Sequence, residues 1–161
     1  MEKKIKYYSL KKIKELHCQY NFIIGERSNG KTYAVLKEIL DNYFNKREQG
    51  AVVRRWQDDF KGKRALQMFA PLVADNVIGK LSKGQWDRID YRSGCWYPAR
   101  YDEDTDTIVR GDEPIAYAFS LSAMEHDKST SYPKITTICF DEVLTRGYYL
   151  VDEGLKEFEE I

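Results

Sequence analysis

Three stretches of the chain carry apolar residues at helical spacing. The clearest is residues 31–46, where apolar side chains return every three or four positions and form one wide face. Residues 5–17 and 58–74 show the same spacing, and the acidic last ten residues are also expected to be helical. We expect Gly50 to end the segment that holds the helix at residues 31–46.

Short apolar runs between these stretches predict strands. They lie at Tyr20–Ile24, from Ala51 to Val53, and at Ile135–Phe140. The last run is β-branched and uncharged, which predicts a buried strand. Strands separated by helices indicate an α/β fold with a mainly parallel sheet flanked by helices.

Residues 77–120 have a different pattern. Aromatic residues are frequent there, and the turn sequences Ser93-Gly94 and Gly111-Asp112 separate them. This pattern predicts a small β meander inserted into the α/β fold. Its aromatic side chains could stack on nucleic-acid bases, but aromatic residues also favour strands, and we expect them to fill the meander's own core.

Composition and length favour one globular domain over residues 1–161. The 161 residues are 42% hydrophobic and 32% charged, which is ordinary for such a domain. The longest mainly apolar run, Ala65–Ala74, is too short for a membrane span, so no membrane partner is expected. The first six residues carry charge without the apolar stretch of a secretory leader.

Charge is distributed unevenly although the net charge is zero. Residues 1–64 hold 16 basic and 8 acidic side chains, and residues 65–161 hold 10 basic and 18 acidic ones. A basic first half can meet the phosphates of a nucleotide or a nucleic acid, although solvated helix faces would give the same pattern. Cys18, Cys95 and Cys139 lie far apart, which argues against a zinc site or disulfide framework and for a reducing compartment.

One motif predicts phosphate binding. It reads G-x-x-x-x-G-K-T and consists of Gly25, Glu26, Arg27, Ser28, Asn29, Gly30, Lys31 and Thr32. The glycines allow backbone angles that bulkier residues resist, so that N–H groups point at a β-phosphate beside the positive end of the next helix. Lys31 is expected to reach the β- and γ-phosphates, and the Thr32 hydroxyl to ligate Mg²⁺.

A second element agrees with this motif. The predicted strand Ile135–Phe140 ends in Asp141 and Glu142. An aspartate at such a strand end orders Mg²⁺ in P-loop ATPases, and an adjacent glutamate can act as general base on the attacking water. The pair therefore favours ATP hydrolysis over phosphoryl transfer to a small molecule.

Four arginines are candidates for stabilising charge in the transition state. Arg27 lies inside the motif, where it could touch the γ-phosphate or a neighbouring subunit. Arg54 and Arg55 end the second predicted strand and Arg146 follows the acidic pair; structural salt bridges are the favoured roles for these three.

One acidic segment matches the pattern of a calcium-binding loop only in part. It places Asp102, Asp104, Asp106 and Glu113 at loop positions 1, 3, 5 and 12, but Thr107 stands where the loop requires glycine. We expect an acidic hairpin tip there.

The sequence resembles the N-terminal ATPase domain of phi29-like bacteriophage DNA-packaging ATPases. The likeness covers about residues 20–150 and lies in Tyr20–Thr32, Val52–Trp56, Ala118–Ser122 and Ser131–Glu142. It implies a P-loop NTPase fold of the additional-strand, catalytic-glutamate type. By position, it also implies that Gly25–Thr32 bind ATP, that Thr32 and Asp141 hold Mg²⁺, and that Glu142, Lys31 and Arg27 are catalytic.

The same resemblance implies a homopentameric ring at the portal vertex of a procapsid in the host cytoplasm, which drives double-stranded DNA inward by hydrolysing ATP. The family continues past this point into further core strands and a nuclease-like domain, whereas this chain has 19 residues after Glu142. We therefore expect an ATPase domain that is incomplete at its C-terminus, with weak or no turnover alone. Two alternatives stay open: a nucleotide-binding assembly module without turnover, and a P-loop ATPase for another phage assembly process.

Overall fold

Six strands form one mixed sheet beside four helices in the computed structural model, which describes residues 8–26, 28–126 and 130–142. The sheet order is β2-β3-β5-β1-β6, with β4 paired to β3. The strands are β1 (Gln49–Arg54), β2 (Arg88–Arg92), β3 (Cys95–Asp102), β4 (Thr107–Arg110), β5 (Ala116–Ser120) and β6 (Ile135–Phe140). The helices are α1 (Lys11–Lys14), α2 (Lys31–Lys46), α3 (Lys63–Ala74) and α4 (Val77–Leu81), with 3-10 turns η1 (Gln57–Phe60) and η2 (Leu121–His126).

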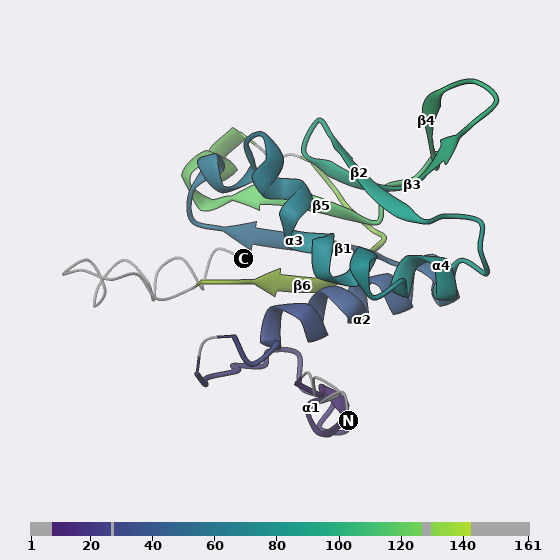
Figure 1. Ribbon diagram of the computed structural model, residues 1–161. Helices are drawn as coiled ribbons and strands as arrows, with labels where there is room; N and C mark the ends of the chain where they lie inside the picture. The colour runs from purple at the N-terminus through teal and green to yellow at the C-terminus, as the bar shows by residue number, and fades with distance from the viewer. Residues whose placement is uncertain (1–7, 27, 127–129, 143–161) are drawn as a thin grey trace.

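The sheet has a parallel half and an antiparallel half. β1 pairs in parallel with both β5 and β6, and their arrows point the same way in Figure 1. β2, β3 and β4 pair antiparallel, and β3 joins them to β5. The predicted α/β fold is thus confirmed, but the sheet is not mainly parallel. The meander is not a separate sheet, because its strands extend the central one.

Helix predictions succeed where the apolar face is wide. The stretch 31–46 is α2. The stretch 58–74 divides into η1 and α3, while of the described part of 5–17 only α1 is an α-helix. The last ten residues lie outside the described residues. No helix in the described part of the chain is long and apolar enough to cross a membrane.

Gly50 does not end the helical segment. α2 stops at Arg47, whose φ of 63° is left-handed, and Gly50 lies inside β1. Its small size has a packing reason, because a Cβ added there would lie 2.5 Å from Cγ2 of Ile39 in α2. Glycine therefore lets the helix approach the strand closely.

Two strand predictions need correction. Tyr20–Ile24 belongs to no strand in the described part of the chain, and its Phe22 and Ile24 are 71% and 91% exposed. An apolar run becomes a strand only when a neighbour accepts its backbone hydrogen bonds. Ile135–Phe140 is a strand, as predicted, but only Cys139 is buried, since β6 is at the end of the strand order and Ile138 is 52% exposed.

The core lies between one face of the sheet and helices α2, α3 and α4. Trp96 on β3 is fully buried, and its indole N–H donates to the Ala65 carbonyl of α3 at 2.9 Å. The rings of Phe60, Phe69 and Tyr91 surround it at centroid distances of 5.8, 5.3 and 5.0 Å. Tyr91 and Trp96 of the meander thus belong to the main core, contrary to the expectation that its aromatic residues fill a separate one.

Other aromatic residues stand on the opposite face of the sheet. Tyr117 and Phe119 on β5 have stacked rings, and Tyr132 packs edge-on against both. This placement follows from strand alternation, because Ala116 and Ala118, which alternate with Tyr117 and Phe119 along β5, face the core.

We predict that Gly50→Ala destabilises the protein by about 1–3 kcal/mol, because the new methyl group collides with a buried isoleucine that cannot move freely. Urea denaturation measures the loss. Ile39→Ala removes the obstacle, so the double variant should lose less than the sum of the two single losses. Additive losses would contradict the proposed collision.

We also predict that the cysteines differ in reactivity. Burial raises the pKa of the Cys139 thiol to about 12, with a further upward contribution from the Asp141 charge, whereas the Cys18 side chain is exposed. Because the thiolate is the reactive form, a maleimide at pH 8 should modify Cys18 in the folded chain and Cys139 only after unfolding. Mass spectrometry of the labelled peptides tests this order, and rapid labelling of Cys139 in the folded chain would refute it.

Candidate active site

The motif Gly25–Thr32 forms the turn that leads into α2. Gly30 caps the helix with φ of 85°, as expected for a glycine, and Ser28 also has a left-handed φ of 61°. The backbone of Gly25 is not left-handed, so the angle argument fails there. A Cβ added at Gly25 would lie 3.1 Å from Nδ2 of Asn29, a tight contact with an exposed side chain.

Lys31 reaches back over this turn. Its ammonium group donates to the carbonyl oxygens of Gly25 and Glu26, at 3.0 and 2.6 Å, and to Oδ1 of Asn29 at 3.1 Å. The Lys31 ammonium is therefore held beside the turn by three neutral oxygen acceptors. Anionic phosphate oxygens could replace these neutral acceptors with stronger charge-assisted bonds.

Thr32 and Asp141 meet although they lie far apart in the sequence. The Thr32 hydroxyl donates to Oδ2 of Asp141 at 3.1 Å, which joins the start of α2 to the end of β6. A hydroxyl and a carboxylate are oxygen donors of the kind that Mg²⁺ prefers, and Mg²⁺ commonly takes its remaining ligands from water and phosphate. The donor set therefore fits a magnesium ion bound together with a nucleotide.

Arg54 bridges the two acidic residues. It is the last residue of β1, and its guanidinium donates to Oδ2 of Asp141 at 2.8 Å and pairs with Oε2 of Glu142 at 2.9 Å. The Arg54 side chain is 16% exposed and that of Asp141 is 23% exposed, so solvent screens this pair only partly. The expected structural salt bridge of Arg54 is confirmed, and the bridge lies inside the candidate site.

Glu142 stands in an uncommon backbone conformation. Its φ is 58°, and its N–H donates to Oδ1 of Asp141 at 3.1 Å. A left-handed φ is sparsely populated by residues other than glycine, asparagine and aspartate, and it concentrates at functional sites. The Glu142 carboxylate is 64% exposed, so it is accessible to solvent water.

The structure thus brings together most of the predicted site residues. Glu26 and Asn29 contact Lys31, and Thr32 contacts Asp141, whereas Arg27 and Arg146 lie outside the described residues. Sequence reasoning did not link Arg54 to the acidic pair. The available signal was its place at the carboxyl end of a strand expected to run parallel to β6.

The acidic segment at residues 102–113 forms a hairpin tip, as predicted. Oδ1 of Asp102 accepts bonds from the N–H groups of Asp104 and Thr105, which closes the turn between β3 and β4. Within the described ranges, no group of three or more His, Cys, Asp or Glu side chains could hold a metal ion.

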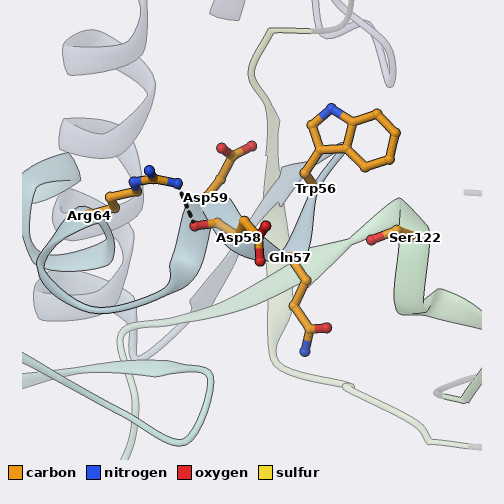
Figure 2. Close-up of a pocket in the computed structure, with 6 residues that line it drawn as sticks. All are labelled: Trp56, Gln57, Asp58, Asp59, Arg64 and Ser122. Atoms are coloured by element: carbon orange, nitrogen blue, oxygen red, sulfur yellow. Dashed lines mark hydrogen bonds between the residues drawn. The ribbon is translucent and has the colours of Figure 1, made fainter.

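A separate pocket of about 460 Å³ lies where the chain leaves β1 and β5. Figure 2 shows Trp56 and Ser122 on one side of it, with Arg64, Asp58 and Asp59 on the other. The Arg64 guanidinium donates to the Asp58 carbonyl at 3.1 Å. None of the residues that line this pocket belongs to the Gly25–Thr32 turn or to the acidic pair.

Comparison with known proteins identifies relatives among phage proteins. The chain is 29% identical to a DNA packaging protein of Bacillus phage B103 over 125 residues, which are 77% of this chain and 32% of that protein. It is 26% identical to the DNA packaging protein of Bacillus phage phi29 over 139 residues, which are 86% of this chain and 35% of that protein. The chain therefore spans about a third of the length of these relatives. No protein-family model matches it.

Solved structures share the fold. The crystal structure of the N-terminal domain of the DNA packaging ATPase from bacteriophage phi29 matches with a TM-score of 0.68 and 20% identity, over 96% of this chain and 69% of that one. The bacteriophage phi29 viral genome packaging motor assembly matches with a TM-score of 0.63 and 22% identity, over 96% of this chain and 42% of that one. The resemblance inferred from the sequence is confirmed: the chain is a homologue of the DNA packaging proteins of Bacillus phages phi29, PZA and B103.

Proposed function

We propose that this chain is the ATP-hydrolysing domain of a motor that packages double-stranded DNA into a phage procapsid. One observation carries the proposal: Thr32, from the turn–helix motif, contacts Asp141, from the strand end, at 3.1 Å. This contact joins the two halves of a phosphate and magnesium site that the sequence holds about 110 residues apart. The relatives named DNA packaging proteins supply the biological setting.

In this proposal the turn binds the nucleotide. The N–H groups of Gly25–Thr32 and the start of α2 face the phosphates, where the helix dipole favours negative charge. Lys31 exchanges its carbonyl acceptors in the turn for β- and γ-phosphate oxygens. Arg27 adds positive charge within the same turn.

The acidic pair provides the hydrolytic chemistry. Thr32 and Asp141 hold Mg²⁺, which, when bound, neutralises charge that develops on the phosphates. Glu142 accepts a proton from the attacking water and so acts as the general base. Its exposed carboxylate and its position next to Asp141 suit this role.

The proposed fold type is the additional-strand, catalytic-glutamate P-loop class. Among the described residues, β6 pairs with β1 along one edge only, and Ile138 on β6 is half exposed. An additional strand paired along the other edge would satisfy its backbone groups and cover Ile138. The exposed apolar side chains of Tyr20–Ile24, just before the phosphate turn, are suited to join the same sheet.

The assembly is part of the proposal. A homopentameric ring would sit at the portal vertex of the procapsid, in the host cytoplasm, with duplex DNA in its channel. Support comes from the solved motor assembly that shares this fold. Contacts with DNA phosphates would make the affinity for duplex DNA fall with salt.

Lys31→Ala should abolish saturable binding of Mg²⁺·ATP, weakening it by about 100-fold or more through the loss of charge-assisted bonds to phosphate. Isothermal titration calorimetry measures this. Lys37→Ala is a matched control, because Lys37 is on the same helix and pairs with Asp41 at 2.6 Å, away from the turn. Equal affinity of the Lys31 variant and the wild-type chain would refute the assigned role.

Glu142→Gln should keep ATP binding and lower turnover by about 10²–10⁴-fold, because the amide cannot accept the proton from water. Phosphate release by a native-length chain measures turnover with and without duplex DNA, and Glu103→Gln on the acidic hairpin is the control. Unchanged turnover in the Glu142 variant would exclude it as the base. Tight ATP binding without turnover in a native-length chain, even with DNA, would favour a nucleotide-binding assembly module.

A further inference from the structure

Arg54 shares an acceptor with the proposed magnesium site. Oδ2 of Asp141 accepts both the Thr32 hydroxyl, at 3.1 Å, and the Arg54 guanidinium, at 2.8 Å. The other oxygen, Oδ1, accepts the N–H of Glu142 at 3.1 Å. Both oxygens of the carboxylate are therefore engaged, and the only full positive charge among these three donors is that of Arg54.

The position of Arg54 follows from the sheet. β1 and β6 run parallel, and Val53 aligns with Phe140, so the residues after these two lie at the same edge. The side chains of Arg54 and Asp141 lie on the same face, where Val52 and Cys139 belong to the core. Pairing and alternation thus direct a cation at the aspartate, without any contribution from a flexible loop.

A magnesium ion and the Arg54 guanidinium cannot both bind the Asp141 carboxylate at full strength. Each is attracted to the same carboxylate, and two cations within a few ångströms repel each other strongly where solvent screening is weak. Arg54 is 16% exposed, so its charge is screened less than that of a surface arginine. The Nε of Arg54 is also buried without a hydrogen-bond partner, so one of the guanidinium donors makes no hydrogen bond that would hold the side chain in place.

We propose that Arg54 is a built-in competitor of Mg²⁺ at Asp141. Its guanidinium neutralises the carboxylate when no metal is bound, and the metal must displace it, so Arg54 lowers the affinity of the chain for divalent cations. Glu142, its second partner at 2.9 Å, keeps the guanidinium nearby after displacement. This inference rests on the proposed function, since it takes Thr32 and Asp141 as the metal site.

Competition at Asp141 has a measurable consequence for metal binding when Arg54 is removed. A residue that merely supported the site would, on removal, weaken metal binding. Removal of a competitor has the opposite effect and strengthens it. The sign of the change therefore separates the two roles.

The test measures binding of Mn²⁺, as a paramagnetic stand-in for Mg²⁺, to the whole chain by electron paramagnetic resonance, with and without ADP. Arg54→Gln should raise the affinity for Mn²⁺ by about 5–100-fold, the usual range for coupled sites. Arg88→Gln, which removes an arginine paired with Asp87 at 2.8 Å in the antiparallel half of the sheet, is the control and should leave it unchanged. Equal or weaker binding by the Arg54 variant would overturn the proposal.

A second measurement follows Arg54 in the wild-type chain and uses a variant only to assign its signal. The Nε–H signal of Arg54 in the wild-type chain, assigned by its loss in Arg54→Lys, is followed by NMR as Mg²⁺ is added to the ADP-bound protein. The signal should move at the metal concentration that saturates the site, and a signal that stays fixed at saturation would refute displacement. Asp141→Asn serves as the reference for the proposed function: if wild-type chain and this variant bind Mn²⁺·ADP equally, the metal site itself is wrong, and the competition fails with it.

Discussion

Parallel pairing of β1 with both of its neighbours is the constraint on which the candidate site depends. Because β1, β5 and β6 run in the same direction, their carboxyl ends meet at one edge of the sheet. Arg54 and Asp141 come from two of these ends, and α2 brings Thr32 to the same place. Ligands of α/β proteins bind at such an edge because the strand-to-helix turns collect there. A shift of β6 by one residue would turn Asp141 to the other face of the sheet, away from Thr32 and Arg54.

The energetics of the site come from partial burial. The side chains of Arg54 and Asp141 are 16% and 23% exposed, so solvent screens their attraction less than that of a surface salt bridge. The charge of Arg54 therefore acts on Asp141 more strongly than the charge of a fully solvated arginine would. The left-handed backbone of Glu142 belongs to the same arrangement, because its N–H and its carboxylate are both engaged by the two neighbouring charged residues.

Close contacts join the helices to the sheet. α2 packs its buried face on β1 so closely that a Cβ added at position 50 would lie 2.5 Å from Cγ2 of Ile39. Trp96 ties the antiparallel half of the sheet to α3 by its indole hydrogen bond. By contrast, the turn before α2 is preceded by the exposed segment Tyr20–Ile24. The side of the site that would contact phosphate is thus less enclosed than the side that would contact metal.

The sequence by itself determined the elements whose cause is local. The wide apolar face of residues 31–46, the β-branched run of Ile135–Phe140 and the turn at Ser93-Gly94 predicted α2, β6 and the hairpin between β2 and β3, and the spacing of the glycine-rich motif located the candidate site. Only the tertiary structure decided what depends on a neighbour: that Tyr20–Ile24 is no strand among the described residues, that Gly50 serves packing, and that Arg54 lies against Asp141 and Glu142. Strand pairing and close packing join residues tens of positions apart, and no periodicity in the sequence records which residues will meet.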